Sequence, residues 1–137
     1  MALDFSKINL EIIDINTNAT PDIFINTNAV TISKRVLEDL GYPQTVQYGT
    51  DPAQHIFAIR VCKSNETRAV PFSKARADQV NTLSITNKNL RDVIKELIPD
   101  YKAKVRYKVT GQFDAENRTM YYDMSTAEEC EFRGGRV

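Results

Sequence analysis

The sequence predicts an α+β fold, mostly β, built from two copies of a strand–helix–hairpin unit. A short apolar strand running into a helix pattern occupies residues 30–43, and a related pattern returns about 53 residues later, at 83–99. Ile32–Ser33 and Ile85–Thr86 precede the two helix patterns in the same way. Two strand-like stretches with turn residues between them follow each helix pattern, so we interpret the chain as a duplicated unit.

Length and composition fit one compact domain. The chain has 137 residues, of which 42% are hydrophobic and 26% charged, as in ordinary globular proteins. No apolar run approaches the roughly 20 residues that span a bilayer, and no signal peptide is visible, so we expect a cytoplasmic protein without membrane contact. Cys62 and Cys130 are then expected to be free thiols, with a bridge as the alternative, because disulfides are rare in the cytosol.

Residues 1–22 are polar and are predicted to be an N-terminal extension. This extension contains alternating apolar residues that predict a strand packed on the domain, with a free arm as the alternative. They are Ile8, Leu10, Ile12 and Ile13.

The first unit covers residues 23–62. It begins with the apolar run 23–25, and a turn leads from there to the strand 30–32. Ser33 has a side chain suited to capping the helix N-terminus, and Gly41 and Pro43 end the helix. A hairpin with strands at 45–48 and 55–62 and a turn at 49–54 is predicted to follow.

A polar connection, residues 63–81, leads to the second unit, and its segment 70–72 is expected to touch the core. The second unit covers residues 82–124. It has a strand at 83–85, a helix capped by Thr86 or Asn87, and a stop at Pro99.

Alternation predicts one long strand over 101–109 in the second unit, with its odd positions facing the core. A polar turn at 111–118 and a strand at 119–124 complete the second hairpin. Residues 125–137 are predicted to be a tail, first acidic and then frayed.

Charge is unevenly distributed along the chain. The net charge is −3 over residues 1–30, +6 over 31–108 and −3 over 109–137. All four even positions of the predicted strand 101–109 are basic, at intervals of roughly 6.6 Å, which is close to the spacing of nucleic-acid phosphates. The basic middle of the chain could be a charge-steered binding surface or chance unevenness. The basic row could contact phosphates or be a solvent face whose charge discourages edge pairing. The candidate nucleic-acid-binding residues are this basic row and the bases at the two helix starts: Lys102, Lys104, Arg106, Lys108, Lys34, Arg35, Lys88 and Arg91.

The first unit resembles the AbrB-type swapped-hairpin regulators. The matching residues are Val30–Ser33, Leu37, Leu40–Gly41, Val46–Tyr48 and Ile56–Ile59. In that family a strand runs into a short helix that a Leu-Gly pair ends, and a hairpin follows. The resemblance covers about residues 23–62 and, more weakly, 83–124. It implies that the two units interlock as a small barrel or pseudo-dimer, and it implies DNA binding.

Catalytic and metal-binding patterns are not found. His55 is the single histidine, and the sequence contains no Gly-rich phosphate loop before a helix and no nucleophile motif. We therefore expect no enzymatic activity, no cofactor and no metal. The first hypothesis is a small DNA-binding transcription regulator that binds duplex DNA. The alternative is a protein-binding accessory or inhibitor protein of a phage or mobile element, antitoxin-like or blocking a nucleic-acid enzyme. Self-association into a homo-oligomer is open in both.

Overall fold

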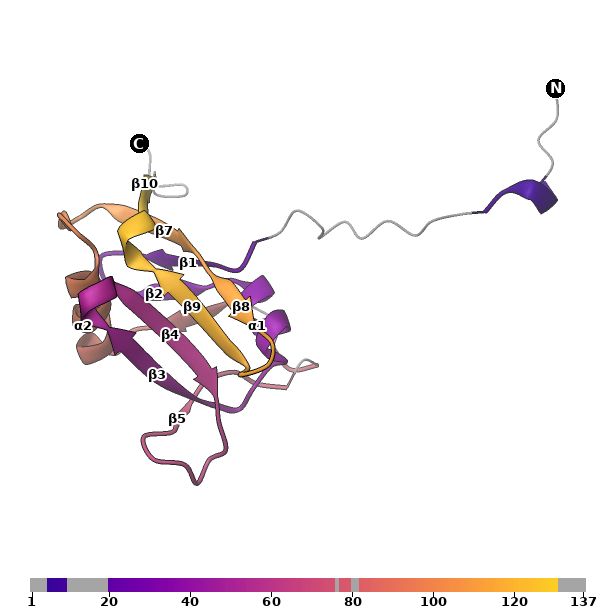
Figure 1. Cartoon of the computed structure of the whole chain (residues 1–137), viewed down its shortest axis with the longest axis horizontal. Helices are drawn as coiled ribbons and strands as arrows, with labels where there is room; N and C mark the ends of the chain where they lie inside the picture. Colours follow the sequence, from indigo (N-terminus) through magenta and orange to yellow (C-terminus); the bar gives the residue numbers. More distant parts are fainter. Residues whose placement is uncertain (1–4, 10–19, 76, 80–81, 131–137) are drawn as a thin grey trace.

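The protein is an α+β sandwich of two antiparallel sheets, each with five strands (Figure 1). The computed structural model describes residues 5–9, 20–75, 77–79 and 82–130. The first sheet has the strand order β10-β7-β1-β2-β6, and the second has the order β5-β3-β4-β9-β8. The predicted class, mostly β, is confirmed. Both sheets remain open, so the predicted closed barrel does not form.

The elements follow one another closely along the chain. The strands of the first sheet are β1 (Asp22–Ile25), β2 (Val30–Ile32), β6 (Leu83–Ile85), β7 (Arg106–Thr110) and β10 (Glu128–Cys130). Those of the second sheet are β3 (Thr45–Asp51), β4 (Ile56–Val61), β5 (Val70–Pro71), β8 (Gln112–Asp114) and β9 (Thr119–Asp123). The helices are α1 (Lys34–Leu40) and α2 (Lys88–Leu97), and short 3-10 turns occupy Phe5–Lys7, Pro52–Gln54 and Met124–Thr126. Neither α1 nor α2 is long and apolar enough to cross a membrane, and the rest of the described chain adds no such helix.

The core lies between the two sheets. Alternate residues of β1 and β2 point inward and are fully buried, as the period of a half-buried strand requires. From the second sheet, the ring of Phe57 stacks on Tyr48 at 5.9 Å and on Tyr122 at 6.1 Å between centroids. The fully buried apolar side chains include Ile23, Ile25, Val30, Ile32, Val46, Phe57, Ile59, Met120 and Tyr122.

Helix α1 ends as predicted but begins differently. Gly41 adopts a left-handed φ of 81°, and its N–H donates to the carbonyl of Glu38, as a glycine stop does. Ser33 occupies the N-cap position, yet its side chain makes no capping hydrogen bond. The Ser33 Oγ is instead buried without a hydrogen-bond partner among the described residues, so the predicted capping role of this side chain is wrong.

Helix α2 is capped by Asn87, whose Oδ1 accepts from the N–H of Leu90 at 3.0 Å. Of the two predicted caps, Asn87 is therefore the one that acts. The side chains of Ile94 and Leu97 are buried, and Val93 is 40% exposed at the margin of the apolar face.

The predicted strand 101–109 is wrong in its first half. Strand β7 begins only at Arg106, and Lys104 lies in a turn with a left-handed φ of 66°. Neither neighbouring strand reaches residues 101–105: β10 pairs with 106–108 and β1 pairs with 107–110. The ring of Tyr101 packs on Tyr107 at 5.4 Å, which folds this segment back against the start of β7.

The second hairpin is also displaced from the prediction. Strand β7 pairs with β1 and β10, while the predicted polar turn 111–118 contains β8, which pairs with β9. The chain crosses from the first sheet to the second at Gly111, whose N–H donates to the carbonyl of Pro21 at 3.0 Å. A Cβ at Gly111 would lie 2.8 Å from the sulfur of Met120, so this close crossing requires glycine.

Three further boundaries differ from expectation. The predicted turn 49–54 begins too early, because β3 continues to Asp51. The connection 63–81 contains β5, and Phe72 after it is buried, which confirms the expected core contact. The predicted tail supplies β10 through residues 128–130.

Ile8 of the predicted N-terminal strand is 46% exposed. The other three residues proposed for that strand lie outside the described residues. Cys62 and Cys130 are free thiols, as predicted.

The order strand–helix–strands occurs twice, as β2-α1-β3-β4-β5 and as β6-α2-β7-β8-β9-β10. Two strand pairs join the first series to the second. β2 pairs antiparallel with β6 about the pair Thr31 and Ser84, and β4 pairs antiparallel with β9 about the pair Ala58 and Tyr121. Because β2 and β6 are antiparallel, α1 and α2 leave from opposite ends of the pair, and Figure 1 shows the helices on opposite sides of the molecule.

Candidate functional site: a groove on the second sheet

The predicted basic row does not form one charged line. Lys102 and Lys104 precede β7, and only Arg106 and Lys108 lie on it. The ammonium groups of Lys102 and Lys108 lie 3.2 and 3.8 Å from carboxylates of Glu129 and Glu128. The row therefore has acidic neighbours supplied by β10.

Arg106 has an aromatic neighbour on the next strand. Its guanidinium lies 4.2 Å from the ring centroid of Phe24 on β1, a cation–π arrangement.

Two of the helix-start bases form ion pairs within their own helices. Arg35 pairs with Asp39 at 2.9 Å and Lys88 pairs with Asp92 at 2.7 Å, each one turn along the helix. The hydrogen bond from Lys88 lowers the pKa of the Asp92 carboxyl.

Arg91 donates from Nε to the carbonyl of Thr86 at 3.0 Å and from Nη1 to that of Thr27 at 3.4 Å. Lys34 is exposed in the first turn of α1. Since α1 and α2 lie on opposite sides of the molecule, the two helix starts are not brought together (Figure 1).

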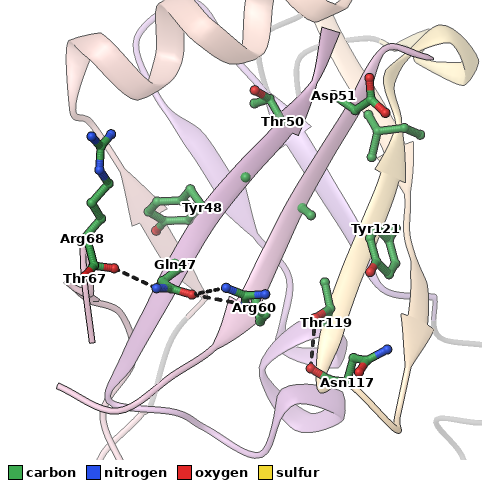
Figure 2. Close-up of a pocket in the computed structure, with 13 residues that line it drawn as sticks. Gln47, Tyr48, Thr50, Asp51, Arg60, Thr67, Arg68, Asn117, Thr119 and Tyr121 are labelled. Atoms are coloured by element: carbon green, nitrogen blue, oxygen red, sulfur yellow. Dashed lines mark hydrogen bonds between the residues drawn. The ribbon is translucent and has the colours of Figure 1, made fainter. Parts of the chain in front are cut away.

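A hollow on the outer face of the second sheet stands out instead. It has a volume of about 750 Å³ and lies over β3, β4 and β9, beside the loop that follows β4 (Figure 2). Because side chains alternate along a strand, the residues of β3 and β4 that face away from the core form its floor, whereas Tyr48, whose ring stacks on Phe57, lies at its margin. The groove is lined by Gln47, Tyr48, Gly49, Thr50, Asp51, Ile56, Ala58, Arg60, Thr67, Arg68, Asn117, Thr119 and Tyr121.

The floor of the groove is low because two small residues meet at its centre. Gly49 of β3 lies opposite Ala58 of β4, and Ala58 lies opposite Tyr121 of β9. A Cβ built on Gly49 would meet no atom within 4 Å. Tyr121 is 41% exposed and forms an aromatic wall beside this floor.

One end of the groove is basic and held in place by hydrogen bonds. Arg60 donates from Nε and Nη2 to the Oε1 of Gln47 at 3.1 and 2.6 Å, and Gln47 donates from Nε2 to the carbonyl of Thr67 at 2.7 Å (Figure 2). These contacts fix the guanidinium and tie the loop after β4 to the sheet. Arg68 in that loop has a left-handed φ of 60° and is exposed, and its side chain extends away from the Gln47–Arg60 contact (Figure 2).

The other end is acidic. Asp51 lines the groove at the far end of β3 (Figure 2). Its carboxylate accepts a hydrogen bond from the Nε2 of Gln54 at 2.7 Å. Asp123 of β9 is exposed and pairs with Ile56, which itself pairs with Asp51. Asp51 is four residues from Gln47 along one strand, which corresponds to about 13 Å. The groove is therefore polarised along β3 and β4.

The ionisable side chains of the groove are few. Its titratable groups are two arginines, an aspartate and two tyrosines, without a nucleophile–base pair. Burial raises the pKa of the Tyr48 phenol at its margin to about 12, so this hydroxyl stays protonated near neutral pH. Within the described ranges, His, Cys, Asp and Glu form no group of three that could hold a metal ion.

His55 lies elsewhere. Its Nδ1 is 2.9 Å from the carbonyl oxygen of Leu97, at the end of α2.

None of the groove residues was predicted as a site. One local pattern pointed toward it: Gly49 follows directly on an alternating strand, where glycine marks either a turn or a close approach of another backbone. A turn is the prediction at this position, whereas β3 continues through Gly49 to Asp51. The pairing of β4 with β9 joins residues about sixty positions apart and leaves no mark in the local sequence.

Comparison of the chain with models of protein families, with curated proteins and with solved structures finds no match. The geometry of the groove is therefore the basis for a functional proposal.

Proposed function

We propose that the chain is a non-enzymatic protein-binding module, and that the groove on the second sheet receives a segment of a partner protein. The observation that carries the proposal is the groove's charge pattern, with Arg60 fixed at one end, an apolar floor at the centre and Asp51 at the other end. A polypeptide can present both charges and an apolar group within a short length. Complementary charges across an interface favour specificity and rapid association.

The contacts of the basic residues favour this function over duplex DNA binding. DNA affinity comes mainly from bases that neutralise phosphates and release counterions. Lys102 and Lys108 already face glutamates, and Lys88 faces an aspartate, so each has a carboxylate competing with any phosphate. A protein partner does not need a continuous basic surface.

The proposal includes an internal duplication related to the AbrB-type arrangement. It is supported by the recurring element order and by the antiparallel pairing of β2 with β6. In this interpretation β4 and β9 are equivalent strands of the two units. The groove then lies over the junction of the units, where Ala58 pairs with Tyr121.

Site-specific photo-crosslinking in lysate of the source cells tests the proposal. A benzophenone amino acid replaces Tyr121 in the groove or, as a control, Val93 on α2. The two native residues are equally accessible, with 41% of Tyr121 and 40% of Val93 exposed. We expect a protein adduct at 121 that survives nuclease, is absent at 93, and weakens when Arg60→Gln is added. Equal adducts at the two positions, or adducts lost on nuclease treatment, would contradict the proposal.

A salt series with duplex DNA completes the test. Wild type and a variant with Lys102, Lys104, Arg106 and Lys108 changed to glutamine are titrated from about 50 mM salt upward. We expect no salt-dependent difference between them. A slope of log affinity against log salt that flattens in the variant, by about 0.9 for each lost phosphate contact, would favour DNA binding.

A further inference from the structure

We propose, building on the protein-binding function above, that the groove recognises an extended segment with a fixed spacing of chemical groups. An acidic residue at position i lies at the Arg60 end, a large apolar residue at i+2 lies on the Gly49–Ala58 floor, and a basic residue at i+4 lies at Asp51. The partner is thus defined by an acid–x–apolar–x–base pattern.

The acidic residue is assigned from the geometry of Arg60. Its Nε and Nη2 are engaged by Gln47, whereas Nη1 takes part in neither of those contacts. Gln47 holds the guanidinium in one orientation, so little side-chain entropy remains to be lost on binding. A carboxylate at this end accepts charge-assisted hydrogen bonds from Arg60.

The apolar residue is assigned from the empty space over Gly49. A Cβ there would touch nothing within 4 Å, and Ala58 opposite adds only a methyl group. Tyr121 stands beside this space with 41% of its side chain exposed. An aromatic or large aliphatic side chain would fill the hollow and pack against the phenol ring.

The spacing comes from the strand register. The pairs Gln47–Arg60, Gly49–Ala58 and Asp51–Ile56 succeed one another at intervals of two residues. Two residues of a strand span about 7 Å, and the same-side groups of an extended ligand repeat at the same distance. An extended segment lying along β4 therefore meets the basic end, the floor and the acidic end with every second side chain.

The acidic end argues against a single-stranded nucleic acid as the occupant. Arginines with a nearby aromatic ring are also typical of such sites. A polynucleotide, however, carries a phosphate at every step, and its phosphates would meet Asp51 and the exposed Asp123. A peptide needs a negative charge at one end only.

The test uses defined peptides and NMR titration. The first peptide contains Asp-Ser-Phe-Thr-Lys between blocked glycines, and the second has the same residues in the order Asp-Phe-Ser-Lys-Thr. We expect the first to shift the amide signals of Gly49, Ala58 and Tyr121 and to bind about tenfold more tightly than the second. Equal affinity of the two peptides would overturn the proposed spacing.

Two variants assign the subsites. Arg60→Gln is expected to weaken binding of the first peptide about tenfold and to weaken a peptide with Asn in place of Asp much less, because a neutral amide oxygen makes no charge-assisted hydrogen bond to the guanidinium. Gly49→Val is expected to abolish binding while the spectrum remains that of a folded protein, since its side chain enters open space. Binding of the first peptide to Gly49→Val with unchanged affinity would contradict the assignment of the floor.

An oligothymidylate serves as the nucleic-acid probe. If it binds the groove more tightly than the first peptide, the peptide assignment is overturned. The crosslinking and peptide experiments together separate the two proposals. Protein adducts at position 121 with equal affinity for the two peptides would contradict the spacing rule and leave the protein-binding function standing. The absence of both the protein adducts and the peptide preference would contradict both proposals.

Discussion

Replacing Gly111 by alanine should destabilise the fold, because this residue sits where the chain crosses between the sheets. A Cβ would lie 2.8 Å from the Met120 sulfur and 2.8 Å from Cε1 of Tyr122, against an ordinary contact distance of about 3.5–4.0 Å. Met120 and Tyr122 are both fully buried, so neither can move outward into solvent. Relief requires a shift of these buried side chains or of the β7–β8 junction, which also carries the hydrogen bond from Gly111 to Pro21.

The expected loss is about 1–2 kcal/mol. Overpacking a core costs about 1–3 kcal/mol, and the lower entropy of an unfolded chain with alanine returns about 0.4–1 kcal/mol. Equilibrium unfolding in urea measures the difference. With a slope of about 1–3 kcal/mol per molar urea, the midpoint should fall by several tenths of a molar unit or more.

Gly49→Ala is the matched control, because the same methyl group enters open space there. Glycine inside a strand is unfavourable by about 0.5–1 kcal/mol relative to alanine, so this variant should be as stable as wild type or more stable. The reasoning fails if Gly111→Ala is as stable as wild type, or if the two variants lose the same free energy.

Local sequence patterns predicted the elements that local forces determine. The strands β2 and β6, the two helices and the stop at Gly41 follow from periodicity and end residues within a few positions. The Ser33 cap shows the limit of such patterns. A serine directly before a helix pattern predicts an N-cap. In the structure the Ser33 N–H donates to the carbonyl of Asp22 on β1 at 3.2 Å, and the Ser33 Oγ does not cap the helix.

Strand length depends on partners that are distant in the chain. Alternation over 101–109 is regular, but a strand needs a neighbour to satisfy its backbone groups. Residues 101–105 have none in the described structure, whereas 106–110 lie between β1 and β10. The partner β10 comes from a segment predicted to be a tail, so its effect on the basic residues was invisible in the sequence.

The candidate site depends on the same distant pairings. The alternation of basic residues predicts a charged row from Lys102 to Lys108. It does not reveal the carboxylates that β10 places beside Lys102 and Lys108. The groove joins small residues on β3 and β4 to an aromatic residue on β9. Each of these residues is ordinary in its own segment, and only the order of strands in the second sheet makes them a surface.

Two further predictions concern the caps and alkaline pH. Asn87→Ala should cost about 0.5–2 kcal/mol in urea unfolding because it removes the capping bond to the Leu90 N–H. Ser33→Ala should cost less, because its hydroxyl makes no such bond; a larger loss for Ser33→Ala would refute this ordering. Burial raises the pKa of Tyr48 to about 12, whereas the unfolded chain releases this proton near pH 10. Between these values the unfolded state binds fewer protons than the native state, so stability falls as pH rises, by up to about 1.4 kcal/mol per pH unit for this group. Below about pH 9 the group contributes almost no pH dependence, because it is protonated in both states. Urea midpoints at pH 8, 10 and 11 should therefore decline less steeply in Tyr48→Phe than in wild type. A residual slope is expected from Tyr101 and Tyr122, because burial raises their pKa values too. Identical slopes in the two proteins would show that the Tyr48 phenol is not desolvated in the native state.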